Sequence, residues 1–210
     1  MGDLELKREA SMRVFALCIV GLLLLAACGN NHDYSPKPRG FYRIEFPKKS
    51  YRDYVSDYPF TFKYPGYAVI QKDTQTRIPT KMLNMNTLLN MNFPQFDGTL
   101  HMSYETITSK KVFDELVEDA HRFAFKNTVK ATDIDQGTIS IPQNKVYGIY
   151  YTIGGNAASS VQFFVTDSVK NYLRGALYFN TEPRLDSIQP VLNFVKQDIN
   201  VMIGSFKWKR

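Results

Sequence analysis

Two cysteines are the residues of this sequence whose chemistry is most clearly defined. Cys18 lies inside an apolar run, Cys28 ends that run, and the 182 residues after Cys28 contain no further cysteine. A chain that loses its apolar run therefore has no disulfide partner for Cys28. The spacing also lacks the Cys-x-x-Cys or Cys/His pairs of a zinc site. What remains for Cys28 is the chemistry of a free, nucleophilic thiol.

The residues in front of Cys28 have the pattern of a bacterial lipoprotein signal, for which Met1 and Met12 are both suitable starts. A basic segment is followed by an apolar core at 14–25, which is shorter than the roughly 20 residues needed to cross a bilayer. The sequence Leu-Ala-Ala-Cys at 25–28 offers two small residues that admit a peptidase and a thiol that receives a diacylglyceryl group. We predict cleavage before Cys28 and its lipidation by acyl chains such as palmitate. A plain secretory signal and a short membrane anchor are the alternatives.

Three segments follow from this pattern. Residues 1–27 form the signal peptide, residues 28–40 form a lipidated tether, and residues 41–210 form a single domain. The tether is polar, carries two prolines and extends over at most about 40 Å. Gly29 stands directly after the cysteine, where an Asp would favour retention in the inner membrane. We therefore expect a cell-envelope protein that is anchored in the outer membrane and faces the periplasm.

Composition limits the class of the mature domain. The net charge of the mature chain, tether included, is +6, because the signal segment holds three basic and three acidic residues. The basic residues are scattered and are not interleaved with aromatics, so the sequence gives no indication of a nucleic-acid groove. Aromatic residues make up 14% of the chain, which suits a β-sheet with a large core.

The periodicity of the apolar residues predicts strands arranged around two helices. A hairpin is expected at 58–70, turning at a Pro-Gly pair. Helices are expected from Ser109 and from near Ser187, which places Pro190 in a first turn. The other strands are expected at 81–93, 99–107, 137–141, 145–153, 160–166, 171–180 and 205–209.

This order of elements indicates the α+β class, with an antiparallel β-sheet and helices packed on it. The meander and the closing helix–strand pattern resemble the PsbP/Mog1-like domain, which implies an α-β-α sandwich. Such a resemblance concerns the fold and does not carry a function with it.

The polar residues show no catalytic constellation. The three histidines, His32, His101 and His121, lack metal-ligand spacing, and no P-loop, dinucleotide or Gly-x-Ser-x-Gly pattern occurs. The glycine pair before Asn156 favours a strand-to-strand turn over a phosphate-binding loop. We therefore predict that the protein has no catalytic residues, no cofactor and no metal site.

The polar residues of segment 154–180 nevertheless form a candidate patch for a protein partner or a ligand. Gln162 and Arg174 lie on expected strands among aromatic residues, so they either pair with each other inside the sheet or face a partner. Asn156 and Asp167, in the neighbouring turns, complete the patch.

Several stretches resemble the GldD-type gliding motility lipoproteins of Bacteroidetes. They are "YSPKPRGFYRIEFPKKSY", "GTLHMSY", and "GNAASSVQFFVTDSVKNYLRGALYFN" followed by "DSIQPVLNFVKQDI". The resemblance covers nearly the whole mature chain. It implies an envelope lipoprotein without catalytic activity, required for gliding and for the linked type IX secretion system. Its implied partners are the lipid membrane, through Cys28, and other gliding and secretion proteins.

Two hypotheses follow. In the first, the domain is a non-enzymatic assembly or stabilising factor that acts through protein–protein contacts while the lipid holds it in place. In the second, it is a periplasmic lipoprotein that binds a small ligand or acts as an enzyme, with Gln162, Asp167 and Arg174 around a pocket. The sequence shows no nucleophile–base set, and this favours the first hypothesis.

Overall fold

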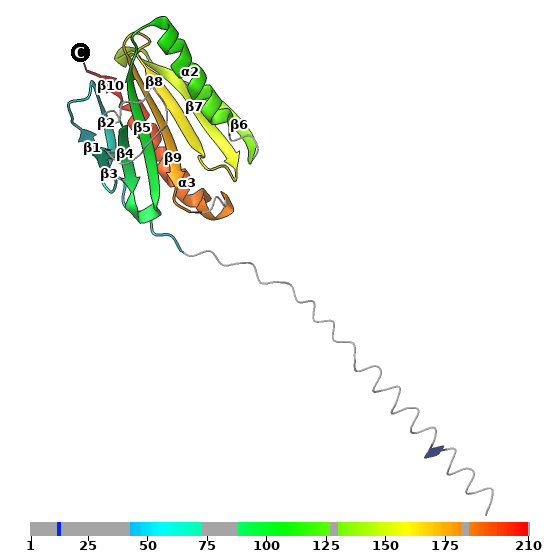
Figure 1. Ribbon diagram of the computed structural model, residues 1–210. Coiled ribbons are helices and arrows are strands. Elements are labelled where there is room, and N and C mark those ends of the chain that lie inside the picture. Colours follow the sequence, from blue (N-terminus) through cyan, green and yellow to red (C-terminus); the bar gives the residue numbers. More distant parts are fainter. Residues whose placement is uncertain (1–11, 14–42, 73–87, 127–129, 182–184, 210) are drawn as a thin grey trace, which may run out of the picture. The chain divides into compact units, whose positions relative to one another are not determined.

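The computed structural model describes residues 12–13, 43–72, 88–126, 130–181 and 185–209 (Figure 1). The contacts divide the chain into two units, Met1–Tyr42 and Arg43–Arg210, and the fold below is that of the second unit. Cys28, the cleavage site and the predicted tether lie outside the described residues, so their roles stay predictions. Of the helices within the described residues, none is both long and apolar enough to cross a bilayer.

The described strands of the second unit form two antiparallel sheets. The large sheet has seven strands in the order β3-β4-β5-β9-β8-β7-β6, and the small sheet has three in the order β1-β2-β10. Their bounds are β1 Tyr51–Tyr54, β2 Phe60–Pro65, β3 Val69–Lys72, β4 Leu88–Phe93, β5 Gly98–Thr106, β6 Ala131–Ile141, β7 Val146–Gly155, β8 Val161–Thr166, β9 Asn171–Phe179 and β10 Lys207–Trp208.

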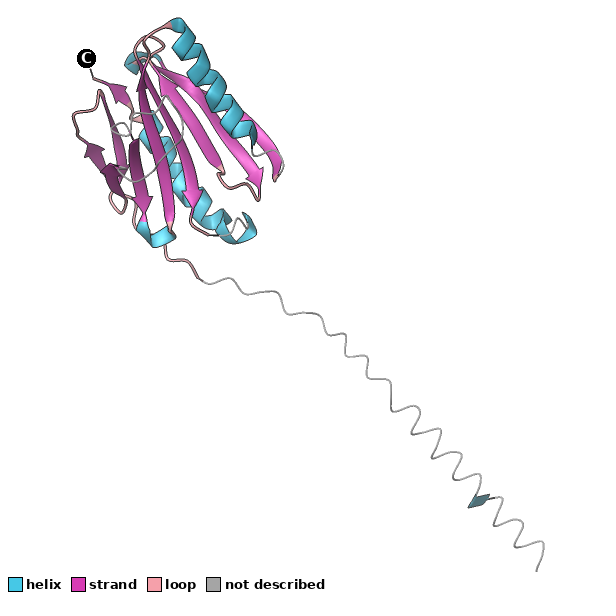
Figure 2. Ribbon diagram, in the orientation of Figure 1, coloured by secondary structure: helices cyan, strands magenta, loops and turns pink. Residues whose placement is uncertain are grey.

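Helices pack on both faces of the large sheet. Helix α2 (Lys110–Phe125) lies on one face and helix α3 (Leu185–Gly204) on the other (Figure 2). Side chains of β8 alternate between them, since Phe163 belongs to the core under α3 and Phe164 to the core under α2. The predicted α+β class and the sheet between two helix layers are therefore confirmed.

Local sequence signals explain much of this arrangement. The Ser109 hydroxyl caps α2 by accepting a hydrogen bond from the Val112 backbone N–H at 3.2 Å, as predicted. Along β5, Leu100 and Met102 are buried while His101 between them is exposed, which confirms the predicted alternation. Short 3₁₀ turns connect β4 to β5 (Pro94–Phe96) and β6 to β7 (Pro142–Asn144).

The predicted hairpin at 58–70 is wrong. Strand β2 pairs with β1 and β10 in the small sheet, whereas β3 pairs with β4 in the large one. At the Pro-Gly pair the chain turns towards the segment before β1 instead of folding back, and the Gly66 N–H donates to the Ser50 carbonyl at 2.8 Å. A two-residue period identifies strands but does not choose their partners.

Two predicted boundaries also differ. Strand β6 starts at Ala131, six residues earlier than expected, and it contains a bulge near Ile134 that interrupts the apolar period. Helix α3 starts at Leu185, so Pro190 lies beyond the first turn and one carbonyl of the preceding turn lacks its helical N–H donor. The first half of the strand predicted at 81–93, up to residue 87, lies outside the described residues.

Candidate functional site

Gln162 and Arg174 contact each other beneath the C-terminal end of α2. The Arg174 guanidinium donates to the Gln162 side-chain carbonyl at 2.6 Å and lies over the Phe123 ring, 4.7 Å from its centroid. Gln162 is 2% exposed, and burial lowers the pKa of Arg174. Of the two arrangements open from the sequence, the structure shows the internal pair, held between the sheet and the helix.

Asp167 organises the turn between β8 and β9. Its Oδ1 accepts backbone hydrogen bonds from Val169, Lys170 and Asn171 at 2.8–3.0 Å, and its Oδ2 accepts the Asn171 side-chain amide at 2.6 Å. Burial acts to raise the pKa of this carboxyl, but the hydrogen bonds from the turn outweigh it and the net pKa is lowered. These bonds give Asp167 a structural role in the turn.

The four residues of the candidate patch do not meet at one place. Asn156 follows β7 and Asp167 follows β8, so the two turns lie at opposite ends of strand β8. Gln162 and Arg174 lie between them and bind each other. A single pocket built from Gln162, Asp167 and Arg174, as the ligand hypothesis requires, is not what the structure shows.

Glu105 is the one described carboxyl group with a pKa raised to near neutrality. It stands opposite Tyr172 in the sheet and is half-buried, and its Oε1 atom is buried without a hydrogen-bond partner among the described residues. Burial raises its pKa to about 7. Burial alone accounts for this shift, because no charged neighbour contributes to it.

The described histidines do not gather into a metal site. His101 on β5 lies 2.7 Å from the Asn90 side-chain oxygen and meets the Tyr178 ring edge-on, while His121 on α2 stacks against Phe125. His32 lies outside the described residues. Within the described parts of the chain, no group of three potential ligands is close enough to hold a metal ion.

A buried carboxylate that sequence reasoning missed joins the start of the domain to α3. Asp198 is 1% exposed; its Oδ1 accepts the Lys49 ammonium at 2.7 Å and the Tyr51 hydroxyl at 2.8 Å, and its Oδ2 accepts the Tyr67 hydroxyl. Lys49 also donates to the Phe194 carbonyl at 2.8 Å. Burial, and then the bond to Asp198, raise the pKa of Tyr51 to about 12. We call Asp198 and these three donors the Asp198 clamp.

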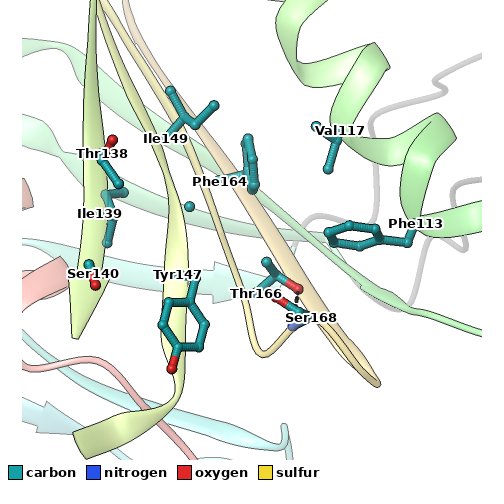
Figure 3. Close-up of a pocket in the computed structure, with 11 residues that line it drawn as sticks. Phe113, Val117, Thr138, Ile139, Ser140, Tyr147, Ile149, Phe164, Thr166 and Ser168 are labelled. Carbon is teal, nitrogen blue, oxygen red and sulfur yellow. Dashed lines mark hydrogen bonds between the residues drawn. The ribbon is translucent and has the colours of Figure 1, made fainter. Parts of the chain in front are cut away.

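An open groove lies between the first half of α2 and the β6–β8 part of the sheet. It has a volume of about 300 Å³, and its walls are largely apolar. Figure 3 shows Phe113 and Val117 of the helix facing the sheet side chains Ile149 and Phe164 across it, with Thr138 and Ser140 of β6 on the far side. Helix α2 packs on β8, and residues of β6, β7 and β8 line the groove on the sheet side.

Strand β6 forms one margin of this groove and one edge of the large sheet. It is the last strand in the sheet order, and among the described residues β7 is its only partner. Of its eleven residues Ile139 alone is buried, and the strand contains neither Lys nor Pro, which commonly protect sheet edges. An exposed edge of this kind presents backbone groups to which another strand can bind.

Only some of these features have a signal in the sequence. The run 131–136 contains two acidic residues that obscure its strand character, so the apolar period predicts a shorter strand at this edge. The clamp had no local signal, because Asp198 lies on a helix of ordinary amphipathic pattern and Lys49 is 149 positions away.

Comparison with known proteins places these observations in a family. A family model described as gliding motility lipoprotein GldD matches residues 31–208. Among solved structures, the chain is similar to the solution structure of cyanobacterial PsbP (CyanoP) from Synechocystis sp. PCC 6803. That similarity has 15% identity and a TM-score of 0.42, and covers 77% of this chain and 94% of that one. The search of curated proteins gave no significant match.

The family model spans both the end of the predicted tether and the whole described fold. It agrees with the resemblance noted from the sequence, and it accounts for a lipoprotein signal in front of an envelope domain. The chain belongs to the GldD family of gliding motility lipoproteins, which are lipid-anchored proteins of the cell envelope.

Proposed function

We propose that this lipoprotein is a non-enzymatic assembly factor of the gliding apparatus and of the linked type IX secretion system. The lipid on Cys28 holds it at the outer membrane, facing the periplasm, and the folded domain binds another envelope protein. The observation that carries the proposal is the exposed edge of β6 with the apolar groove beside it.

The partner supplies an extended segment that adds to the large sheet at β6. Backbone hydrogen bonds along the edge provide the affinity, and alternate side chains of the segment enter the groove next to Phe113 and Phe164. The exposed edge carries Asp133 and Asp135 and no basic residue, so a segment with basic side chains fits it best.

The two halves of the proposal are tested by two variants in the native host. Cys28→Ala is expected to move the protein out of the membrane fraction on detergent partition. Thr138→Lys places a charged side chain at the margin of the groove, on the exposed edge, and is expected to abolish co-purification of the partner and cell gliding while leaving the protein in the membrane.

A matched control separates docking from general damage. Thr106→Lys makes the same change at an exposed position of β5. Tyr104, two residues earlier on the same face of this strand, belongs to the core under α3, on the face of the sheet opposite the groove. It is expected to leave partner binding intact. Retention of the partner by Thr138→Lys would overturn docking at β6, and a soluble protein before any mutation would overturn the lipid anchor.

A further inference from the structure

The positive charge of the mature chain is concentrated directly behind the predicted lipidation site. Residues 29–52 contain six basic and two acidic residues, a net charge of +4. Residues 53–210 contain 17 basic and 15 acidic residues, a net charge of only +2 over a segment more than six times as long. The structure describes residues 43–52 of this basic segment and shows how their charges are presented.

The described part of the basic segment is fixed to the domain. The Phe46 ring stacks on Phe194 of α3 with 4.6 Å between centroids, and the Glu45 carbonyl accepts the Gln95 side-chain amide at 2.8 Å. The Asp198 clamp then holds Lys49. Residues 43–50 therefore hold a fixed position relative to α3, and so does any surface that they bind.

The side chains divide between internal and external roles. Lys49 binds Asp198, and Arg52 donates to the Gly66 and Ala68 carbonyls. Arg43 and Lys48 are exposed on the surface, and Phe46 between them is 40% exposed. Two cations flanking an exposed aromatic ring suit the interface of an anionic membrane, where phosphate groups attract the charges and the ring enters the headgroup layer.

We propose that Arg43, Phe46 and Lys48 form a membrane-docking surface that binds the phosphate headgroups of anionic lipids beside the Cys28 anchor. Fourteen residues lie between Cys28 and Arg43, and this stretch reaches at most about 50 Å, so the surface stays within range of the same membrane. Its contact would orient the domain, because the segment is fixed to α3. The inference rests on the lipid anchor for its setting, and it is independent of docking at β6.

The first test measures binding without the lipid. The mature chain 28–210 carrying Cys28→Ala keeps the whole unit Arg43–Arg210 and is sedimented with vesicles of phosphatidylcholine and phosphatidylglycerol or of phosphatidylcholine alone. Binding is expected with the anionic vesicles and to weaken with salt. The double variant Arg43→Gln/Lys48→Gln is expected to bind them about 30-fold more weakly, since one basic residue near an anionic surface contributes about fivefold.

A matched double variant separates a local surface from overall charge. Lys110→Gln/Lys111→Gln removes the same charge at the start of α2, on the other face of the sheet, where both side chains are exposed. It is expected to change vesicle binding less than about twofold. Equal losses in the two double variants, or equal binding to both kinds of vesicle, would overturn the proposal.

A second readout reports orientation. The mature Cys28→Ala chain has no other cysteine, so Glu45→Cys and Glu118→Cys each accept one environment-sensitive fluorophore. Both positions are exposed, one beside Phe46 and one on α2. On anionic vesicles the emission is expected to shift to shorter wavelength at position 45 and to stay unchanged at position 118. A shift at both positions, or at neither, would contradict a single oriented contact.

Discussion

Helices α3 and α2 pack on opposite faces of the same sheet but cover it to different depths. In α3, five apolar side chains are less than 8% exposed: Leu192, Val195, Ile199, Met202 and Ile203. In α2 only Ala120 and Ala124 are buried, and the groove lies beside the helix. Helix α3 therefore buries more apolar surface than α2, and we expect it to contribute more to the stability of the fold. On the α2 side the groove stays open for the proposed partner.

The largest expected effect is on the α3 side, at the Asp198 clamp. Asp198→Ala leaves the Lys49 ammonium and two Tyr hydroxyls without their acceptor, and we expect a loss of about 3 kcal/mol in the free energy of unfolding. This value lies at the lower end of the loss expected when a buried ion pair is broken, because the Lys49 side chain is 27% exposed. Urea denaturation of the mature chain measures it.

The control for the clamp is an exposed ion pair. Lys63 and Asp53 lie 3.0 Å apart with side chains 50% and 66% exposed, and Lys63→Ala is expected to cost less than about 1 kcal/mol. Similar losses for Asp198→Ala and Lys63→Ala would show that the clamp contributes no more than a surface pair.

The next effect compares the two helices directly. Leu192→Ala in α3 removes a side chain that is 3% exposed and is expected to cost about 3 kcal/mol. Leu116→Ala in α2 removes a half-buried side chain that packs against the core under α2, and it is expected to cost about 1 kcal/mol. Equal losses in the free energy of unfolding for the two variants, measured by thermal or urea denaturation, would show that the two helices stabilise the fold to the same extent.

The smallest effect concerns pH on the α2 side. Burial raises the pKa of Glu105 to about 7 in the folded protein from an ordinary 4.5. The folded protein therefore favours the protonated form of this side chain. The stability that this form provides is lost as the pH rises from 4.5 through about 7. Glu105→Gln is expected to raise the free energy of unfolding at about pH 8 by about 1 kcal/mol, a value reduced for solvent screening at this half-buried site, and to have little effect at about pH 5.

Urea denaturation of both proteins at the two pH values checks this expectation. A gain for Glu105→Gln that is the same at both would show that burial of the carboxylate is not its cause. A loss at the higher pH would mean that the Glu105 carboxylate has a stabilising partner in the folded protein.

Local patterns were enough to predict part of this molecule. The Ser109 cap, the alternation along β5 and the α+β class all depend on residues close together in sequence. The failed hairpin and the clamp depend instead on contacts between distant segments, such as Gly66 with Ser50 and Asp198 with Lys49. Periodicity carries no information on these partners.

The candidate patch shows the same limit. The sequence identified Gln162 and Arg174 as polar groups on strands, but only the sheet register and the position of α2 decide that they bind each other. The groove likewise results from how α2 lies over β8, and no motif in the chain encodes that offset. The lipidation of Cys28 stays a prediction; it can be made from sequence alone because a peptidase and an acyltransferase recognise linear residues.

The pairing of β10 with β2 has a consequence for the timing of export. Trp208 lies opposite Phe60, and Phe206 packs against the same ring, so the small sheet joins residues separated by almost the whole domain. A chain that crosses a membrane with its signal end first delivers β2 early and β10 late. The small sheet therefore cannot close until residue 208 has crossed, and strand β2 lacks one of its two partners until then.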